Sequence, residues 1–451
     1  MNVYIKTYGC QMNERDSESA AAMLVSAGHH IVNSEQDADI IILNTCSVRE
    51  QAERKAIGKL GILKKLKREH PHMIFGIMGC MAQSRGEELL KSVEHLDFAV
   101  GTDNIHAIPE IVEDVIREKH KIRRDDRKGA DTPGIDAHRV NAEAGQFNAF
   151  ISISRGCNRY CSYCIVPYVR GPERSRNMDG IVAEAAELAE HGIREIMLLG
   201  QNVAAYGLDG VPPPIADDNS PFAELLERIS AIDGIRRIRF TSPHPAFFNR
   251  KLIETIARLP KVCKCIHLPL QSGNDRVLHA MNRHYDMARY MDTVRYMREK
   301  IPELTLTSDI IVGFPGETEA EFEDTLRALS DIRFDMIYSF IYSPRKGTPA
   351  AEMEQVPEEV QKNRFARMLE LQNGVSMEKN QPLVGKTLRV LCDGVSKSNA
   401  DLWTGRTAGN KSVFFPGSPD TTPVGQFIPV RIERAAPFAL YGKAENPADI
   451  L

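Results

Sequence analysis

Apolar and polar positions along the first 120 residues alternate between two periods, one typical of strands and one typical of helices. Short apolar runs of strand length are separated by stretches in which apolar residues recur every three or four positions. The pattern predicts strands and helices in the order 2–10, 16–27, 38–46, 48–69 and 73–80, with further helix up to Lys119. Strands that alternate with helices indicate an α/β domain with a parallel sheet, which we place at residues 1–120.

The pattern fades in residues 121–148, where mixed charges, glycine and proline predict a linker. Six apolar runs follow, each separated from the next by a helical stretch, and they begin at residues 149, 195, 236, 263, 304 and 334. Six strand-helix units predict a partial (βα)6 barrel over residues 149–378. This fold carries its chemistry on the loops that follow the strands.

The last segment, residues 382–443, follows a predicted helix at 358–379 and has a different pattern. Its apolar runs are short and are broken by glycine and proline, which predicts a small β-barrel. It carries eight basic and four acidic side chains, so it is suited to bind RNA through phosphates, with Trp403, Phe414 and Phe415 available for base stacking. In an ordinary barrel these aromatic side chains would form the core instead. The basic residues that we assign to RNA binding are Arg389, Arg406, Lys411, Arg431 and Arg434.

Composition narrows the class of protein. The chain has 451 residues, more than one core supports, and its net charge of −4 excludes a uniformly basic nucleic-acid coat. No apolar run approaches the ~18 residues of a membrane-spanning helix, and no secretory signal follows Met1, so we expect a cytoplasmic protein with no membrane contact. The nine cysteines, an odd number, favour metal binding or core packing over disulfides.

Two sets of three cysteines carry the candidate chemistry. Cys10, Cys46 and Cys80 each follow one of the three amino-terminal apolar runs, so all three are expected at the carboxyl edge of the sheet. Each could be a buried small side chain, but three in the same position indicate a shared site. The second set, in the segment SRGCNRYCSYCIVPYVRG, follows the first barrel strand and comprises Cys157, Cys161 and Cys164.

The second set alone leaves two kinds of metal site open. Three thiols cannot be paired in disulfides, and a tetrahedral zinc site would need a fourth ligand from elsewhere in the chain. A 4Fe-4S cluster could use three thiolates and leave one iron for a further ligand. The segment by itself does not decide between them.

These features resemble two nested families. The spacing C-x3-C-x2-C after a first barrel strand resembles that of the radical S-adenosylmethionine enzymes, in which three thiolates hold a 4Fe-4S cluster whose open iron binds S-adenosylmethionine. Motifs spread over nearly the whole chain resemble the methylthiotransferases of that superfamily: YGCQMNERDSE, NTCSVREQAERK, GCMAQ, GCNRYCSYCIVPYVRG, LLGQNV, LPLQSGN, GFPGET and GRTAGNK. The resemblance implies an amino-terminal cluster domain, a radical barrel and a terminal RNA-binding barrel called TRAM. It also implies that Cys10, Cys46 and Cys80 hold a second 4Fe-4S cluster.

Within the family, YGCQMN and SVREQAERK resemble the branch that acts on N6-isopentenyladenosine beside the tRNA anticodon. The resemblance implies methylthiolation at C2 of that base, a position that needs a radical because its C–H bond is not activated for acid-base chemistry. The implied partners are the anticodon stem-loop, S-adenosylmethionine and an electron donor such as a flavodoxin or ferredoxin. Other branches act on threonylcarbamoyladenosine or on a ribosomal protein aspartate. A non-enzymatic alternative is an RNA-binding module with structural iron-sulfur sites.

The remaining candidates lie near the ends of the predicted barrel strands, where we expect S-adenosylmethionine to bind. They are Tyr163, Gly200, Gln201, Asn202, Ser242, Gln271, Ser272 and Asp309. The alternative for each is a loop-capping role, or packing beneath the loop for Tyr163. His267 is expected to be a buried, hydrogen-bonded core residue. Arg159 departs from the family pattern, in which asparagine is common between the first two cysteines of the loop.

Overall fold

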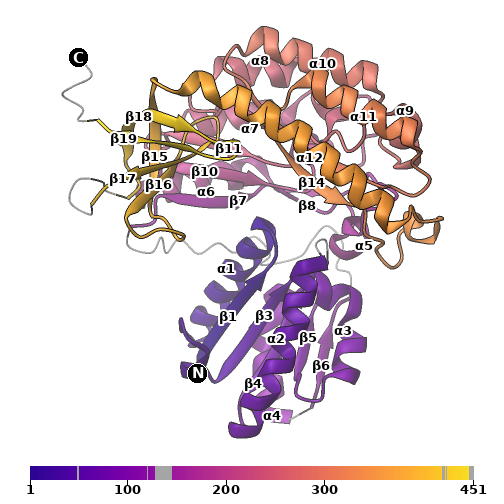
Figure 1. Ribbon diagram of the computed structural model, residues 1–451. Coiled ribbons are helices and arrows are strands. Elements are labelled where there is room, and N and C mark those ends of the chain that lie inside the picture. The colour runs from indigo at the N-terminus through magenta and orange to yellow at the C-terminus, as the bar shows by residue number, and fades with distance from the viewer. Residues whose placement is uncertain (48–49, 119, 127–144, 419–421, 423, 446–451) are drawn as a thin grey trace.

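The computed structural model shows an amino-terminal α/β domain, a central partial barrel and a small closed β-barrel (Figure 1). It describes residues 1–47, 50–118, 120–126, 145–418, 422 and 424–445. Most of the predicted linker, residues 127–144, and the predicted helix start at residues 48–49 lie outside these ranges. No helix in the described part of the chain combines the length and the apolar character needed to cross a membrane.

The amino-terminal domain is built on a six-stranded parallel sheet in the order β2-β1-β3-β4-β5-β6. The central strands are buried apolar runs because separate clusters of apolar side chains cover the two faces of the sheet. The strands are β1 (Asn2–Tyr8), β2 (His30–Ile31), β3 (Ile40–Thr45), β4 (Ile74–Gly79), β5 (Phe98–Val100) and β6 (Ile122–Arg124). The helices are α1 (Gln11–Ser26), α2 (Glu50–Glu69), α3 (Cys80–Ser92) and α4 (Ile108–Glu118).

This domain extends past the boundary predicted at residue 120. Strand β6 pairs in parallel with β5 and forms one edge of the sheet. It has only three residues, and two of them are arginine, so it carries no apolar period from which the sequence could predict a strand. The segment predicted as a linker from residue 121 therefore begins with a strand of the sheet.

The central part is a six-stranded partial barrel with parallel strands, as predicted. Two three-stranded sheets, β11-β10-β7 and β12-β13-β14, are joined by a parallel bridge between Ile238 and Val262. The strands are β7 (Asn148–Ser152), β10 (Glu195–Leu199), β11 (Arg237–Phe240), β12 (Cys265–His267), β13 (Thr305–Val312) and β14 (Met336–Ile341). The longer helices are α6 (Met178–Glu190), α7 (Pro221–Ser230), α8 (Arg250–Arg258), α10 (Met287–Lys300), α11 (Glu319–Ile332) and α12 (Glu358–Asn380).

Side chains alternate across the strands of this barrel. Ile266, Leu306 and Ile337 belong to the largest apolar core, which the outer helices share. Because successive residues of a strand point to opposite faces, the residues directly before and after each of these three in its own strand face the barrel interior. The interior wall is therefore free to carry polar and aromatic groups.

The carboxyl-terminal part is a closed barrel in the order β15-β16-β17-β19-β18. Its strands are β15 (Thr387–Val395), β16 (Leu402–Arg406), β17 (Ser412–Pro416), β18 (Phe427–Ala435) and β19 (Leu440–Ala444). Trp403 and Phe415 lie in the core of this barrel, so the suggestion that they stack on RNA bases is wrong. Phe414 is half-buried and stacks on Tyr441.

Buried arginines connect the small barrel to the central one. Arg237 Nη1 donates to the backbone oxygen of Arg406 at 2.9 Å, and Arg239 Nη2 donates to that of Thr407 at 2.8 Å. Gly409 approaches β13 so closely that a Cβ there would lie 2.5 Å from Thr305 Oγ1. Since Arg237 and Thr305 begin their strands, the small barrel covers the end of the central barrel opposite the carboxyl edge.

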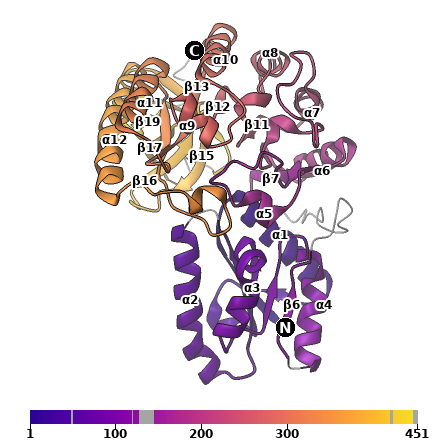
Figure 2. The same ribbon diagram turned by 90° about the vertical axis from the view of Figure 1, so that its right-hand side faces the viewer.

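The amino-terminal domain meets the central barrel at a different place. Short helix α5 (Val166–Arg170), in the cysteine loop of the barrel, lies at this junction in both views (Figures 1 and 2). Thr102 Oγ1 donates to the backbone oxygen of Val169 at 2.7 Å, and Arg174 pairs with Asp103 at 2.9 Å. The two cysteine sets therefore face the same junction.

Candidate active site

The loop that carries the second cysteine set begins directly after short strand β8 (Ser154–Arg155). Gly156 has φ 76°, and a Cβ on it would lie 1.9 Å from the backbone oxygen of Pro172, so only glycine fits the first turn. The backbone N–H of Cys157 donates to Gly171 O at 3.1 Å, and that of Cys164 donates to Cys161 O at 2.9 Å. These bonds fold the loop so that its three thiols lie near one another.

The electrostatics of these thiols suit a metal cluster. The pKa of Cys157 and of Cys164 is raised to about 12, chiefly by burial and in part by the neighbouring Cys161 thiol. The two groups therefore stay protonated unless a metal stabilises the thiolate. Arg283 Nη1, also buried, donates to Cys161 Sγ at 3.3 Å, which supplies a cation to one member of the set.

The amino-terminal cysteines lie at the ends of three neighbouring strands. Cys46 and Cys80 are buried, Cys10 is half-buried, and none of the chain's nine cysteines forms a disulfide. The pKa of Cys80 is raised to about 11, chiefly by burial and in part by Cys46 and Cys10, so both of these thiols lie within electrostatic reach of Cys80. The structure thus brings the set together at the carboxyl edge of the sheet.

Two buried asparagines hold these strand ends; both stand in the quoted motifs YGCQMNERDSE and NTCSVREQAERK, but neither was predicted as a site residue. Asn13 Nδ2 donates to Asn44 Oδ1 at 2.9 Å, and Asn44 Nδ2 donates to the backbone oxygen of Asn13 at 2.6 Å. Gly79 has φ 93°, and a Cβ there would lie 2.5 Å from Asn44 Oδ1. This network fixes the turns that lead into Cys10 and Cys80.

The two cysteine sets share one wall. Cys80 packs with Ile165 and Val169, which follow Cys164 in the barrel loop. Next to them, Arg170 is buried and lowers the pKa of Cys80 by its positive charge. The two cysteine sets therefore lie on opposite sides of a thin apolar partition formed by Ile165 and Val169, one set in the amino-terminal domain and the other in the central barrel.

Asp16 of α1 anchors this partition. It is fully buried, and its Oδ2 lies 3.0 Å from Arg170 Nη2 while its Oδ1 lies 2.8 Å from Arg155 Nη2. Arg15, its neighbour, pairs with Glu184 of α6 at 3.2 Å. Charges that resemble surface residues in the sequence thus bind the two domains together.

A single metal ion and a 4Fe-4S cluster make different demands on such cysteines. Among the residues that the structure describes, no three His, Cys, Asp or Glu side chains gather closely enough to hold one ion. In a 4Fe-4S cluster each thiolate binds a different iron, so the ligands need not converge on a single point, and three thiolates leave one iron open. Six buried or half-buried cysteines in two sets of three fit two such clusters.

Several buried polar atoms at the carboxyl edge of the barrel have no hydrogen-bond partner in the described part of the chain. They are Ser154 Oγ, Gln201 Oε1, Asn202 Nδ2 and His244 Nε2. Gly200 lies beside them, and a Cβ there would lie 2.5 Å from Ser154 Oγ. Unpaired buried polar atoms are costly, so this group fits a polar ligand such as S-adenosylmethionine. The candidates Gly200, Gln201 and Asn202 come together here.

The other candidates for cofactor binding divide. Ser272 is fully buried with its Oγ 3.4 Å from Thr325 Oγ1 of α11, so it braces the loop outside the barrel and its assignment is corrected. Gln271 has φ 73° and its backbone pairs with β13. Ser242 also has a positive φ, of 60°, and is half-buried. Tyr163 packs against an apolar cluster, the alternative that the sequence left open.

Arg159 is also placed by the structure. It is buried, lies 4.7 Å over the ring of Phe247, and has its Nη2 3.6 Å from Glu173. Burial raises the pKa of Glu173 to about 7 even though Arg159 lowers it. The departure from the family pattern therefore introduces a charged pair beneath the cysteine loop.

Lys411, one of the five residues predicted to bind RNA, is turned inward. Its Nζ lies 3.0 Å from Asp335 Oδ1 and 2.7 Å from Asn380 Oδ1, both on the central barrel. The prediction for Lys411 is therefore wrong, because its charge is used to dock the small barrel.

The other four basic residues are exposed. Arg389 lies 4.0 Å over the ring of Phe427, and Arg434 lies 3.6 Å over that of Tyr441. Arg406 lies 3.6 Å from Asp393 and donates to Asn410 Oδ1 at 3.3 Å, and Arg431 lies 3.9 Å from Glu445. All four are placed where phosphates could reach them.

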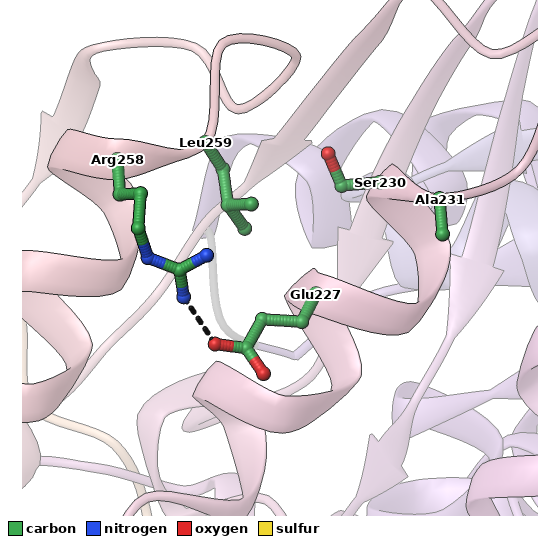
Figure 3. A pocket seen from close by; sticks show the side chains of 5 residues that line it. All are labelled: Glu227, Ser230, Ala231, Arg258 and Leu259. Atoms are coloured by element: carbon green, nitrogen blue, oxygen red, sulfur yellow. Dashed lines mark hydrogen bonds and ion pairs between the residues drawn. The ribbon is translucent and has the colours of Figure 1, made fainter.

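A surface hollow of about 340 Å³ lies elsewhere, between α7 and the end of α8 (Figure 3). Its lining includes Arg258, which pairs with Glu227, together with Ser230, Ala231 and Leu259. None of these side chains belongs to the cysteine sets or to the barrel interior. The hollow is therefore a feature of the outer helices and not of the candidate active site.

Comparisons with known proteins connect this geometry to a family. Family models match the Radical SAM superfamily at residues 151–329, the Uncharacterized protein family UPF0004 at residues 2–101 and the TRAM domain at residues 381–444. Two relatives named tRNA-2-methylthio-N(6)-dimethylallyladenosine synthase, from Akkermansia muciniphila and Moorella thermoacetica, are each 45% identical to this chain. The match covers 98% of both chains for the first and 97% of both for the second. The chain belongs to the tRNA-2-methylthio-N(6)-dimethylallyladenosine synthase family.

As a member of the tRNA-2-methylthio-N(6)-dimethylallyladenosine synthase family, the chain is a radical S-adenosylmethionine enzyme that uses S-adenosylmethionine and a 4Fe-4S cluster. The predicted family and fold class are confirmed. A solved structure of TsrM, a radical S-adenosylmethionine methyltransferase from Kitasatospora setae, has a TM-score of 0.55 and 12% identity. It covers 78% of this chain and 74% of TsrM, and this likeness shows the fold alone.

Proposed function

We propose that this chain transfers a methylthio group to C2 of N6-isopentenyladenosine, next to the anticodon of tRNA, with the use of two 4Fe-4S clusters. The name shared by its full-length relatives supports the substrate. The observation that carries the two-cluster proposal is the shared wall, on which Cys80 contacts Ile165 and Val169. Two cysteine sets on either side of a thin partition are suited to sequential steps on one substrate atom.

Each set has its own role in this proposal. A cluster on Cys157, Cys161 and Cys164 would supply, with S-adenosylmethionine, the radical that opens the C2–H bond, while one on Cys10, Cys46 and Cys80 would carry the sulfur. The residues of this chain bury the thiols and place a cation, Arg283 or Arg170, beside each set.

The partners follow from the surfaces around these sites. The unpaired polar atoms of Gln201 and Asn202 would orient S-adenosylmethionine, and Arg406 and Arg431 would contact the phosphates of the anticodon stem-loop. A flavodoxin or ferredoxin would deliver electrons in the cytoplasm. The TRAM match supports RNA as the macromolecular partner.

The primary test is nucleoside mass spectrometry of tRNA from a strain without this gene and from the same strain complemented with it. The 2-methylthio form of isopentenyladenosine should disappear and return, with unmodified isopentenyladenosine accumulating in between. Loss of a 2-methylthio threonylcarbamoyladenosine instead would move the chain to the neighbouring branch. An unchanged tRNA profile would favour a protein substrate or a purely structural role for the clusters.

Iron analysis tests the cluster assignment. The reconstituted chain should hold about eight irons, and alanine substitution of either cysteine set should leave about four. Only the variant of the barrel set, Cys157, Cys161 and Cys164, should lose cleavage of S-adenosylmethionine. Cys392→Ala, in the core of the small barrel, serves as the control and should retain all iron. Full iron content in either triple variant would contradict the assignment.

A further inference from the structure

The interior wall formed by β12, β13 and β14 carries a cluster of side chains, of which only Asp309 was predicted from the sequence as a candidate for cofactor binding. It comprises His267, Thr307, Asp309, Tyr338 and Phe340. Residues next to them in sequence, such as Ile266, Ile310 and Ile337, point the other way into the main core. The two-residue period of the strands therefore places the whole cluster on the barrel interior.

Strand register brings the members of this cluster into contact. Asp309 lies directly opposite Tyr338, and His267 lies directly opposite Thr307. His267 Nδ1 lies 3.1 Å from Thr307 Oγ1, and its Nε2 lies 3.4 Å from Asp309 Oδ2. The ring of Tyr338 meets that of His267 edge to face, with centroids 5.6 Å apart. The His267 imidazole therefore contacts Thr307, Asp309 and Tyr338. Its contact with Asp309 orients that carboxylate.

The aromatic members are exposed although they lie within the barrel. Tyr338 is 45% and Phe340 39% exposed, and the side chain of Asp309 is 28% exposed. His267, expected from the sequence to be a core residue, is half-buried and belongs to this wall. Two exposed rings beside an accessible carboxylate, on the concave side of a barrel, make a surface suited to a flat, partly apolar molecule with a hydrogen-bond donor.

We propose that this wall binds the target base, with Asp309 accepting the N6–H of N6-isopentenyladenine, Tyr338 stacking on the purine and Phe340 contacting the isopentenyl group. This inference rests on the proposed function and names the residues that select its substrate. The sequence had assigned Asp309 to S-adenosylmethionine, but the residue lies within β13 and is held by His267, whereas the unpaired polar atoms suited to the cofactor lie on other loops. Asp309 is thus a specificity-determining residue, and His267 is its positioning residue.

The N6–H contact can be tested with two anticodon stem-loops that differ only at N6. One carries isopentenyladenosine, and the other carries N6-methyl-N6-isopentenyladenosine, which lacks the N–H. Equilibrium binding to the full-length enzyme, measured by fluorescence anisotropy without reductant, should favour the first by roughly 10- to 100-fold, the range for a hydrogen bond to a charged group. In Asp309→Ala this ratio should fall to near one, because the acceptor is gone, and comparison of the four affinities cancels any steric effect of the extra methyl.

The stacking contact needs a second pair of probes. Tyr338→Ala should weaken binding of the isopentenyladenosine stem-loop by about 5- to 150-fold, the range for one base-aromatic stack, and should leave binding of an abasic stem-loop unchanged. Phe438→Ala removes a ring that is 60% exposed on the small barrel and serves as the control for both probes.

Each outcome has one meaning. If wild-type enzyme fails to modify any stem-loop, the proposed function itself is wrong. If it modifies the isopentenyladenosine stem-loop but Asp309→Ala keeps the full preference for the N6–H, the base-binding assignment alone is overturned. Cleavage of S-adenosylmethionine by Asp309→Ala, measured without RNA, should match the wild type and shows that the variant is folded and loaded.

Discussion

Replacement of Asp16 by alanine should loosen the junction on which both cysteine sets lie. The carboxylate is fully buried and pairs with Arg155 at 2.8 Å and with Arg170 at 3.0 Å, and both arginines are themselves buried. Removing one partner of a buried ion pair costs roughly 3–5 kcal/mol, because the remaining charge is left uncompensated. Since about 1.4 kcal/mol corresponds to a tenfold change, the junction should open about 100- to 4,000-fold more often.

Hydrogen exchange followed by mass spectrometry measures this opening directly. Peptides from α1 and α5 should lose protection by that factor in Asp16→Ala, while peptides from the small barrel should not change. Glu87→Gln is the matched control, because Glu87 also makes two ion pairs in this domain, with Lys91 and Arg123, but is exposed. Unchanged protection of α1 and α5 in Asp16→Ala would refute the view that these buried charges hold the domains together.

Three further changes have defined outcomes. Arg283→Met should lower the midpoint potential of the barrel cluster, followed by electron paramagnetic resonance, because a donor to Cys161 Sγ that favours the more negative reduced form is lost; an unchanged potential would contradict this role. Arg431→Gln should reduce the salt dependence of tRNA binding by about one unit, whereas Lys411→Gln should lower the melting temperature without changing that slope; equal slopes for both variants would contradict the division. Burial raises the pKa of Glu317 to about 7, so the native chain holds an extra proton and its stability falls as pH rises from about 4.5 to 7. Glu173, whose pKa is also raised to about 7, contributes over the same interval, so Glu317→Gln should reduce the change in melting temperature without abolishing it, and an unchanged slope would contradict the role of Glu317.

The sequence predicted what depends on local pattern and on chain topology. The positions of Cys10, Cys46 and Cys80 followed from three apolar strands, because parallel strands end at one edge of their sheet. The partial barrel and the small closed barrel followed from the spacing of their strands. Each inference needed only the period of the apolar residues and the turns between them.

What the sequence could not predict depends on contacts between distant parts of the chain. Asp16 and Arg170 are 154 positions apart, and each resembles a solvated charge on a helix until the domains are docked. Lys411 resembled the other basic residues of its segment, and only the position of Asp335 shows its inward role. Strand β6 forms because its backbone pairs with β5, and its own residues carry no strand pattern.

The contacts of Arg237 and Arg239 separate the attachment of the small barrel to the central barrel from the character of its outward surface. The outward surface can therefore change, in evolution or by design, without loss of these contacts. Both guanidinium groups donate to backbone oxygens of residues 406–408, so this part of the attachment depends on the path of that turn and on glycine at 409, and the Lys411 side chain adds its own contact with Asp335. A domain transplanted from another protein would dock here if it reproduced that turn and a lysine at the position of Lys411, whatever sequence it presented outward. The outward surface can therefore change to bind RNAs of other shapes, while the small barrel continues to cover the end of the central barrel opposite the carboxyl edge.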